Sequence, residues 1–177
     1  IVDKKGQSKA LNESGRLMIL TCSNFGGYLK RPHLNDTDAE GWFDTGDIAY
    51  QDEQGYIRIC GRKKDVIIRG GENIPVAEIE SLLYKHPNIA TVALVAYADE
   101  RMGERACAII KLKDPAQPLS FNELVEFLKT HNLTMQYLPE RLEIWAEIPM
   151  TPSGKIQKFK LRELLAQHIA STAVEAN

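Results

Sequence analysis

The pattern of apolar and polar residues changes about one third of the way along the chain. Up to residue 60 the apolar segments are short. They comprise the run 16–21 and the strands 47–50 and 56–60 of an expected β-hairpin around the turn 52–55. Gly-Gly at 26–27 and Lys-Arg-Pro at 30–32 interrupt the remainder. Residues 1–60 therefore offer little material for a core of their own.

From residue 66 onward the pattern predicts both strands and helices. We expect a short strand at 66–69 and a helix that begins at Pro75, buries residues 76, 79, 82 and 83 on one face, and stops before Pro87. The β-branched runs 89–98 and 106–112 predict two buried strands, paired antiparallel across a turn that contains Gly103.

The last sixty residues continue this mixture of elements. Ser120 and Glu123 form a capping box that opens a helix to about residue 131. Alternating apolar positions over 142–148 predict a half-buried strand. A turn-rich loop at 149–155 then leads into an amphipathic helix marked by the apolar residues 161, 164, 165 and 169.

Together these elements predict the α+β fold class. Residues 64–177 form a small domain with a short β-hairpin and a central, mostly antiparallel sheet flanked by helices. Residues 1–63 form a β-rich segment in front of it. The chain begins without Met, which we interpret as a piece of a longer protein.

Composition narrows the classes of function. A net charge of −2 argues against bulk nucleic-acid binding, and no apolar run is long enough to span a bilayer. The three cysteines fit neither a zinc pattern nor a disulfide framework, which favours a reducing, cytoplasmic setting. The four histidines also lack metal-ligand spacing, so we expect no metal site.

Three motifs carry candidate chemistry: Phe-Asp-Thr-Gly-Asp at 43–47, Gly-Arg-Lys-Lys-Asp at 61–65 and Thr-Pro-Ser-Gly-Lys at 151–155. The carboxylate of Asp47, at a Thr-Gly-Asp turn, has two oxygens and can accept from two neighbouring ribose hydroxyls. The guanidinium of Arg62 is a planar fork suited to phosphate or ribose oxygens. Lys155 follows a glycine and would bring a point charge on a mobile loop.

Each motif also has a purely structural interpretation. Asp47 can cap its own turn, and Arg62 can pair at the surface with Asp65 or Glu72. Most lysines such as Lys155 are simply exposed loop residues.

In this order the three motifs resemble the C-terminal end of the acyl-adenylate-forming enzymes, which include acyl-CoA synthetases, peptide-synthetase adenylation domains and luciferases. The resemblance implies that Asp47 and Arg62 bind ATP or AMP and that Lys155 is the catalytic lysine of adenylation. It also implies that Lys64 is the hinge for rotation of the small domain.

The segment 65–74 is most similar to fatty acyl-CoA and carnitine-type CoA ligases. In that branch, Gly70 and Gly71 would line the tunnel for the pantetheine arm of CoA, whereas on structural grounds they make a simple turn between strand and helix. Lys158 lies where the family often has Arg, and we assign it no site role.

The implied reaction activates a carboxylic acid, most simply a fatty acid, with ATP to an acyl-AMP and then transfers the acyl group to CoA. The phosphate-binding loop, the Mg²⁺ site and the acyl pocket would lie in a large N-terminal domain that residues 1–63 complete. The resemblance thus predicts that this chain alone is inactive, with ATP, Mg²⁺, CoA and its own N-terminal domain as partners.

Two other functions stay open: an adenylation domain that loads a carrier protein, and a non-catalytic interaction module. The resemblance also makes Lys155 a target for a lysine acetyltransferase, because neutralising its ammonium would silence adenylation. Peripheral membrane association of the parent is a further open alternative to a purely cytoplasmic location.

Overall fold

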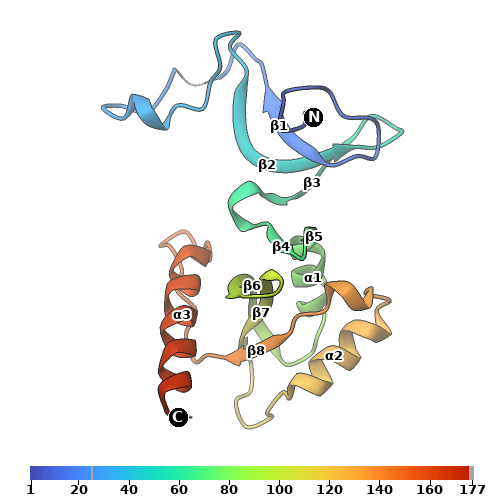
Figure 1. The fold of residues 1–177 in the computed structure, drawn as a ribbon, viewed down its shortest axis with the longest axis vertical. Coiled ribbons are helices and arrows are strands. Elements are labelled where there is room, and N and C mark those ends of the chain that lie inside the picture. The colour runs from blue at the N-terminus through green and yellow to red at the C-terminus, as the bar shows by residue number, and fades with distance from the viewer. Residues whose placement is uncertain (25, 176–177) are drawn as a thin grey trace. The chain divides into compact units, whose positions relative to one another are not determined.

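The computed structural model describes residues 1–24 and 26–175. It divides the chain into two compact units, Ile1–Lys64 and Asp65–Asn177. Within the described residues, no helix is both long enough and apolar enough to cross a membrane. Figure 1 shows the course of the chain and the labels of its elements.

The first unit is built on an antiparallel sheet. Within its described residues the sheet has three strands in the order β1 (Gly15–Ile19), β2 (Phe43–Gln51), β3 (Ile57–Arg62). A short 3-10 helix, η1 (Pro32–Leu34), lies in the long connection between β1 and β2. The expected hairpin is present, but β2 begins at Phe43, so the Thr-Gly-Asp segment lies inside a strand and the predicted turn is wrong.

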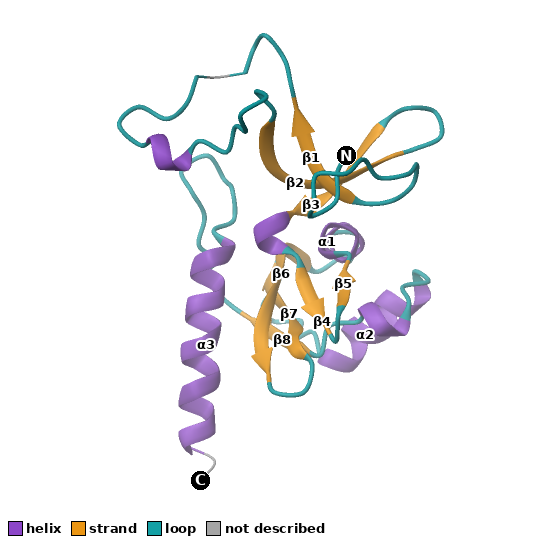
Figure 2. Ribbon diagram, turned by 45° about the horizontal axis from the view of Figure 1, so that its top comes forward, coloured by secondary structure: helices purple, strands orange, loops and turns teal. Residues whose placement is uncertain are grey.

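The second unit contains a mixed sheet with helices on both faces. Over its described residues the strand order is β5 (Glu72–Ile74), β4 (Ile67–Arg69), β7 (Gly103–Leu112), β6 (Ile89–Asp99), with β8 (Arg141–Ile144) pairing to β7 in parallel. The other pairings are antiparallel, which confirms the predicted mostly antiparallel sheet. Figure 2 colours these strands orange and the helices that cover them purple.

The sheet separates the core into two layers, each covered by helices. α1 (Val76–Leu83) and α2 (Phe121–Thr130) pack on one face of the sheet, and α3 (Lys158–Glu175) packs on the other (Figure 1). Successive residues of a strand point to opposite faces, so Leu94 joins the α1–α2 layer while Val95 joins the α3 layer. Burial on both faces explains why β6 and β7 read as continuous apolar runs.

The capping box and the two buried strands predicted from the sequence are present in the structure. The capping box is formed: the Ser120 hydroxyl accepts from the Glu123 amide at 3.2 Å, and the Glu123 carboxylate accepts from the Ser120 amide at 2.8 Å. The predicted buried strands correspond to β6 and β7.

Three further expectations differ from the structure. The strand expected over 142–148 is shorter: β8 ends at Ile144, and just beyond it the Trp145 amide still donates to the Ile110 carbonyl of β7. The structural interpretation of Gly70 and Gly71 as a turn between a strand and a helix is wrong, because they join β4 to β5 in a short β-hairpin. Leu164 was assigned to the apolar face of α3 but is 43% exposed, whereas Leu161 and Leu165 are fully buried.

The burial of Cys107 gives a chemical test of this fold. Desolvation at the centre of β7 raises the pKa of the Cys107 thiol to about 12, so almost no reactive thiolate exists near neutral pH. We expect a maleimide reagent at pH 7 to modify the exposed Cys22 rapidly and to leave Cys107 unmodified until the protein is unfolded in urea. Mass spectrometry of the labelled peptides measures this; equal labelling of both cysteines in the folded protein would contradict the burial.

Candidate functional site

The structure brings Asp47 and Arg62 together. They are directly opposite each other on β2 and β3, and the Arg62 Nε lies 3.1 Å from the Asp47 Oδ1. The pair is open to solvent, since the Arg62 side chain is 69% exposed and that of Asp47 is 25% exposed. Sheet register therefore joins two residues that the motifs suggested separately.

The structure gives these two residues partners other than those that their structural interpretations suggested. The carboxylate that caps the backbone here belongs to Asp44, which accepts from the Gly46 amide at 2.9 Å. Asp65, suggested as a surface partner of Arg62, instead forms an ion pair with Arg162.

A cleft of about 490 Å³ opens beside this pair, within the first unit. Its lining combines aromatic rings, carboxylates and three consecutive cations, a composition that suits a planar, anionic ligand. The residues that give it this character are Tyr28, Phe43, Asp36, Asp44, Arg62, Lys63 and Lys64.

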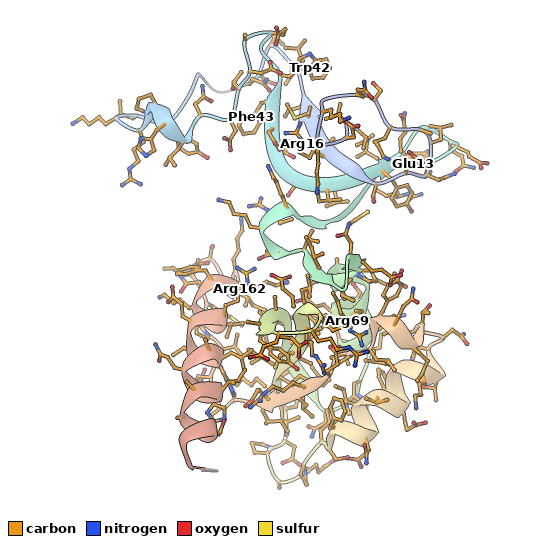
Figure 3. All side chains as sticks on the ribbon, viewed as in Figure 1. Glu13, Arg16, Trp42, Phe43, Arg69 and Arg162 are labelled. Atoms are coloured by element: carbon orange, nitrogen blue, oxygen red, sulfur yellow. The ribbon has the colours of Figure 1, made fainter. Side chains whose placement is uncertain are left out.

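Asp44 lines this cleft and is held in place by two basic side chains. Its side chain is 13% exposed and accepts from the Arg16 guanidinium at 3.0 Å, while the Lys63 ammonium lies 3.8 Å away. Arg16, labelled in Figure 3, also donates to the Asp3 carbonyl at 3.4 Å. Sequence reasoning missed Asp44 and Arg16; their 28-residue separation gives no local signal of their contact.

Lys64 lies at the junction of the two units. It is the middle residue of the single-turn helix η2 (Lys63–Asp65), and the division between the units falls directly after it. A residue that absorbs the φ/ψ change of a hinge is expected between regular elements, so the place of Lys64 inside a 3-10 turn differs from that expectation.

Gly70 and Gly71 form the turn of the β4–β5 hairpin, with φ of +57° and +89°. A Cβ on Gly70 would lie 2.7 Å from the Met102 Cε, whereas among the described residues a Cβ on Gly71 would meet nothing within 4 Å. The backbone at Gly71 is therefore open to an approaching ligand, and Gly70 is closed off by Met102.

Lys155 ends a tight, exposed loop in the second unit. The Thr151 amide donates to the Lys155 carbonyl at 2.8 Å, and the Lys155 amide donates to the Thr151 hydroxyl at 3.0 Å. Gly154, at φ +79°, allows this turn. Within the described residues the Lys155 ammonium has no ion-pair partner, so its charge is available to a ligand.

Comparison with known proteins connects these features. Residues 78–155 match the family model described as the AMP-binding enzyme C-terminal domain. The chain is 44% identical, over 85% of its own length and 27% of the relative's, to a medium-chain fatty-acid–CoA ligase of Escherichia coli. It is 40% identical to a mitochondrial medium-chain acyl-CoA ligase of Homo sapiens, over 93% of the chain and 27% of the relative.

Solved structures agree with these relatives. The chain superposes on o-succinylbenzoate CoA synthetase of Bacillus subtilis in complex with an acyl-adenylate intermediate, with a TM-score of 0.82, 30% identity, and coverage of 91% of this chain and 33% of that one. The same enzyme with ATP and magnesium gives a TM-score of 0.81 at 30% identity, over 90% of this chain and 33% of that one. The chain thus spans about a third or less of the proteins that it matches.

The exposure of the Asp47–Arg62 pair makes a prediction about stability. An exposed ion pair contributes about 0–1 kcal/mol, so Arg62→Ala should lower the free energy of unfolding by less than about 1 kcal/mol. Arg16→Ala is the matched comparison, and it should cost more because it leaves the nearly buried Asp44 carboxylate without its arginine. Urea unfolding of both variants measures the difference; a larger loss for Arg62→Ala would show that its main role is structural.

Proposed function

We propose that this chain, whose residues 78–155 belong to the AMP-binding enzyme C-terminal domain family, is the C-terminal part of an AMP-forming acid–thiol ligase. The parent activates a carboxylic acid, most simply a medium-chain fatty acid, as an acyl-AMP and passes the acyl group to CoA. The observation that carries the proposal is the meeting of Asp47 and Arg62 on adjacent strands beside a cleft lined with rings and cations.

Asp47 and Arg62 are assigned to the nucleotide. The Asp47 carboxylate accepts hydrogen bonds from the two ribose hydroxyls, and the Arg62 guanidinium donates to ribose or phosphate oxygens. Arg62 lines the cleft, and its ion pair with Asp47 holds the two side chains together before ATP arrives, which reduces the cost of ordering them on binding.

Lys155 is assigned to the adenylation step. A carboxylate oxygen of the acid attacks the α-phosphorus of ATP, the bond to the bridging oxygen breaks, and pyrophosphate leaves. Two anions approach each other in this step, and the Lys155 ammonium offsets their repulsion and the charge that develops in the transition state. Its lack of a partner among the described residues supports this role.

The second step requires a different arrangement. The small domain first rotates about Lys64, which withdraws Lys155 from the nucleotide. The CoA thiolate then attacks the acyl carbonyl, and AMP leaves. The open backbone at Gly71 then contributes to the CoA tunnel, with Gly70 holding the hairpin against Met102. The division of the chain directly after Lys64 supports that hinge.

The remaining parts are assigned to an N-terminal domain of the parent. Among the described residues of Ile1–Lys64, Ala49 is the one buried hydrophobic residue, whereas Leu20, Leu29 and Ile59 are more than half exposed. This unit lacks a core of its own, which supports residues 1–63 as the end of a larger domain and residues 64–177 as the mobile domain. The described residues offer no group of three or more candidate metal ligands, so we assign the Mg²⁺ that accompanies ATP to that larger domain.

The function is tested by carboxylate-dependent exchange of labelled pyrophosphate into ATP in the full-length parent, over short- to long-chain acids. We expect exchange with medium-chain acids, a fall of about 10²–10³-fold in Lys155→Ala, and no exchange by the 177-residue chain alone. Lys160→Ala, at an exposed position, is the matched control.

The outcomes of this experiment separate the alternatives. Exchange that is indifferent to Lys155 would refute the assigned catalytic residue, and its complete absence with every acid would favour a non-catalytic module. Acyl transfer to a carrier-protein thiol but not to CoA would instead show an adenylation domain that loads a carrier.

Acetylation of Lys155 gives a second test. We expect acetyl-lysine at position 155 to abolish pyrophosphate exchange, because acetylation removes the charge, while thioester formation from supplied acyl-AMP continues. The exposure of the Lys155 loop supports access by an acetyltransferase. Acetyl-lysine placed at 160 serves as the control, and full exchange activity after quantitative acetylation at 155 would exclude this form of regulation.

A further inference from the structure

A second lysine lies three residues after Lys155 and has a very different environment. The Lys158 Nζ lies 2.7 Å from the Glu80 Oε1, and the two side chains are only 16% and 19% exposed. The same Glu80 oxygen accepts from the Leu94 amide at 2.7 Å. One carboxylate thus joins α1, the edge strand β6 and the first residue of α3.

Lys158 is unfavourably placed for a lysine that serves only helix stability. A cation at the N-terminus of a helix opposes the helix dipole, and a mostly buried charge is costly unless it is paired. Lys160, two residues later in the same helix, is exposed. The ion pair with Glu80 offsets both costs for Lys158. Because Glu80 also accepts from the Leu94 amide, the pair ties the start of α3 to α1 and β6.

The start of α3 directly follows the base of the Lys155 loop. The Gln157 amide donates to the Pro149 carbonyl at 2.9 Å, and Met150 forms an antiparallel bridge with Ile156. The two ends of the loop are therefore tied together immediately before Lys158. Because this closed loop is joined directly to Lys158, we expect a shift of Lys158 to change the direction in which the loop and Lys155 point.

We propose that Glu80 and Lys158 form a positioning pair that sets the direction in which the Lys155 loop projects. The inference rests on the proposed role of Lys155 in adenylation. It gives Lys158 a task other than contact with phosphate, since its ammonium is held by Glu80. It also gives α1 a part in the chemistry, since Glu80 acts through Lys158 and the Lys155 loop.

The test uses the full-length parent with Lys158→Met and Glu80→Gln. Glu80→Gln removes the charge but keeps an oxygen that can accept from the Leu94 amide. Lys160→Met and Glu78→Gln are matched controls at exposed positions on the same two helices. Each protein is assayed for pyrophosphate exchange, for thioester formation from supplied acyl-AMP and CoA, and for its melting temperature.

We expect Lys158→Met and Glu80→Gln to lower kcat of exchange by about 10-fold or more, since a small misplacement of a catalytic group is costly. The KM for ATP and the rate of the thioester step should stay within about twofold of wild type, as expected when only Lys155 is misplaced. Lys158→Arg, which keeps the charge, should retain most of the exchange activity. Combined with Lys155→Ala, Lys158→Met should cause no further loss, because residues that act through one group are non-additive.

Three results would overturn the proposal. Wild-type exchange in Lys158→Met, alongside its collapse in Lys155→Ala, would refute the positioning pair and leave the proposed function intact. An equal fall in both half-reactions, together with a lower melting temperature, would show that the pair only stabilises the fold. Exchange that is indifferent to Lys155→Ala would remove the proposed function and this inference together.

Discussion

The antiparallel ladder between β6 and β7 is the constraint on which the second unit depends. It runs from Ile89 opposite Leu112 to Asp99 opposite Gly103, and the side chains at its centre are buried on both faces. A sheet buried on both faces must be covered twice, so α1 and α2 pack on one side and α3 on the other. The positions of Glu80, on α1, and of the Lys155 loop, which leads into α3, both follow from that covering.

The two units differ in how much of their stability is internal. Asp65–Asn177 contains both layers of the hydrophobic core, whereas the described residues of Ile1–Lys64 bury a single hydrophobic side chain, Ala49. The first unit instead relies on sheet hydrogen bonds and on charge pairs such as that of Arg16 with Asp44. This asymmetry fits the proposal that residues 1–63 complete a larger domain and residues 64–177 form a mobile one.

Burial separates the charge pairs into two kinds. Lys158–Glu80 is largely removed from solvent, so each charge needs the other and the pair acts as a joint. The Arg62 side chain of the Arg62–Asp47 pair is exposed, so water competes for both charges and the pair contributes little to stability. Burial thus distinguishes a lysine–glutamate pair that joins structural elements from an arginine–aspartate pair that stays accessible to solvent.

The sequence by itself determined the features that depend on neighbouring residues. The apolar runs of β6 and β7 and the Ser120 capping box formed as their local patterns indicated, because these patterns act over a few residues. Only the tertiary structure decided the parallel pairing of β8 and the contact of Lys158 with Glu80. Such contacts join residues far apart in sequence, and register, burial and the covering of two sheet faces select them after the local elements exist.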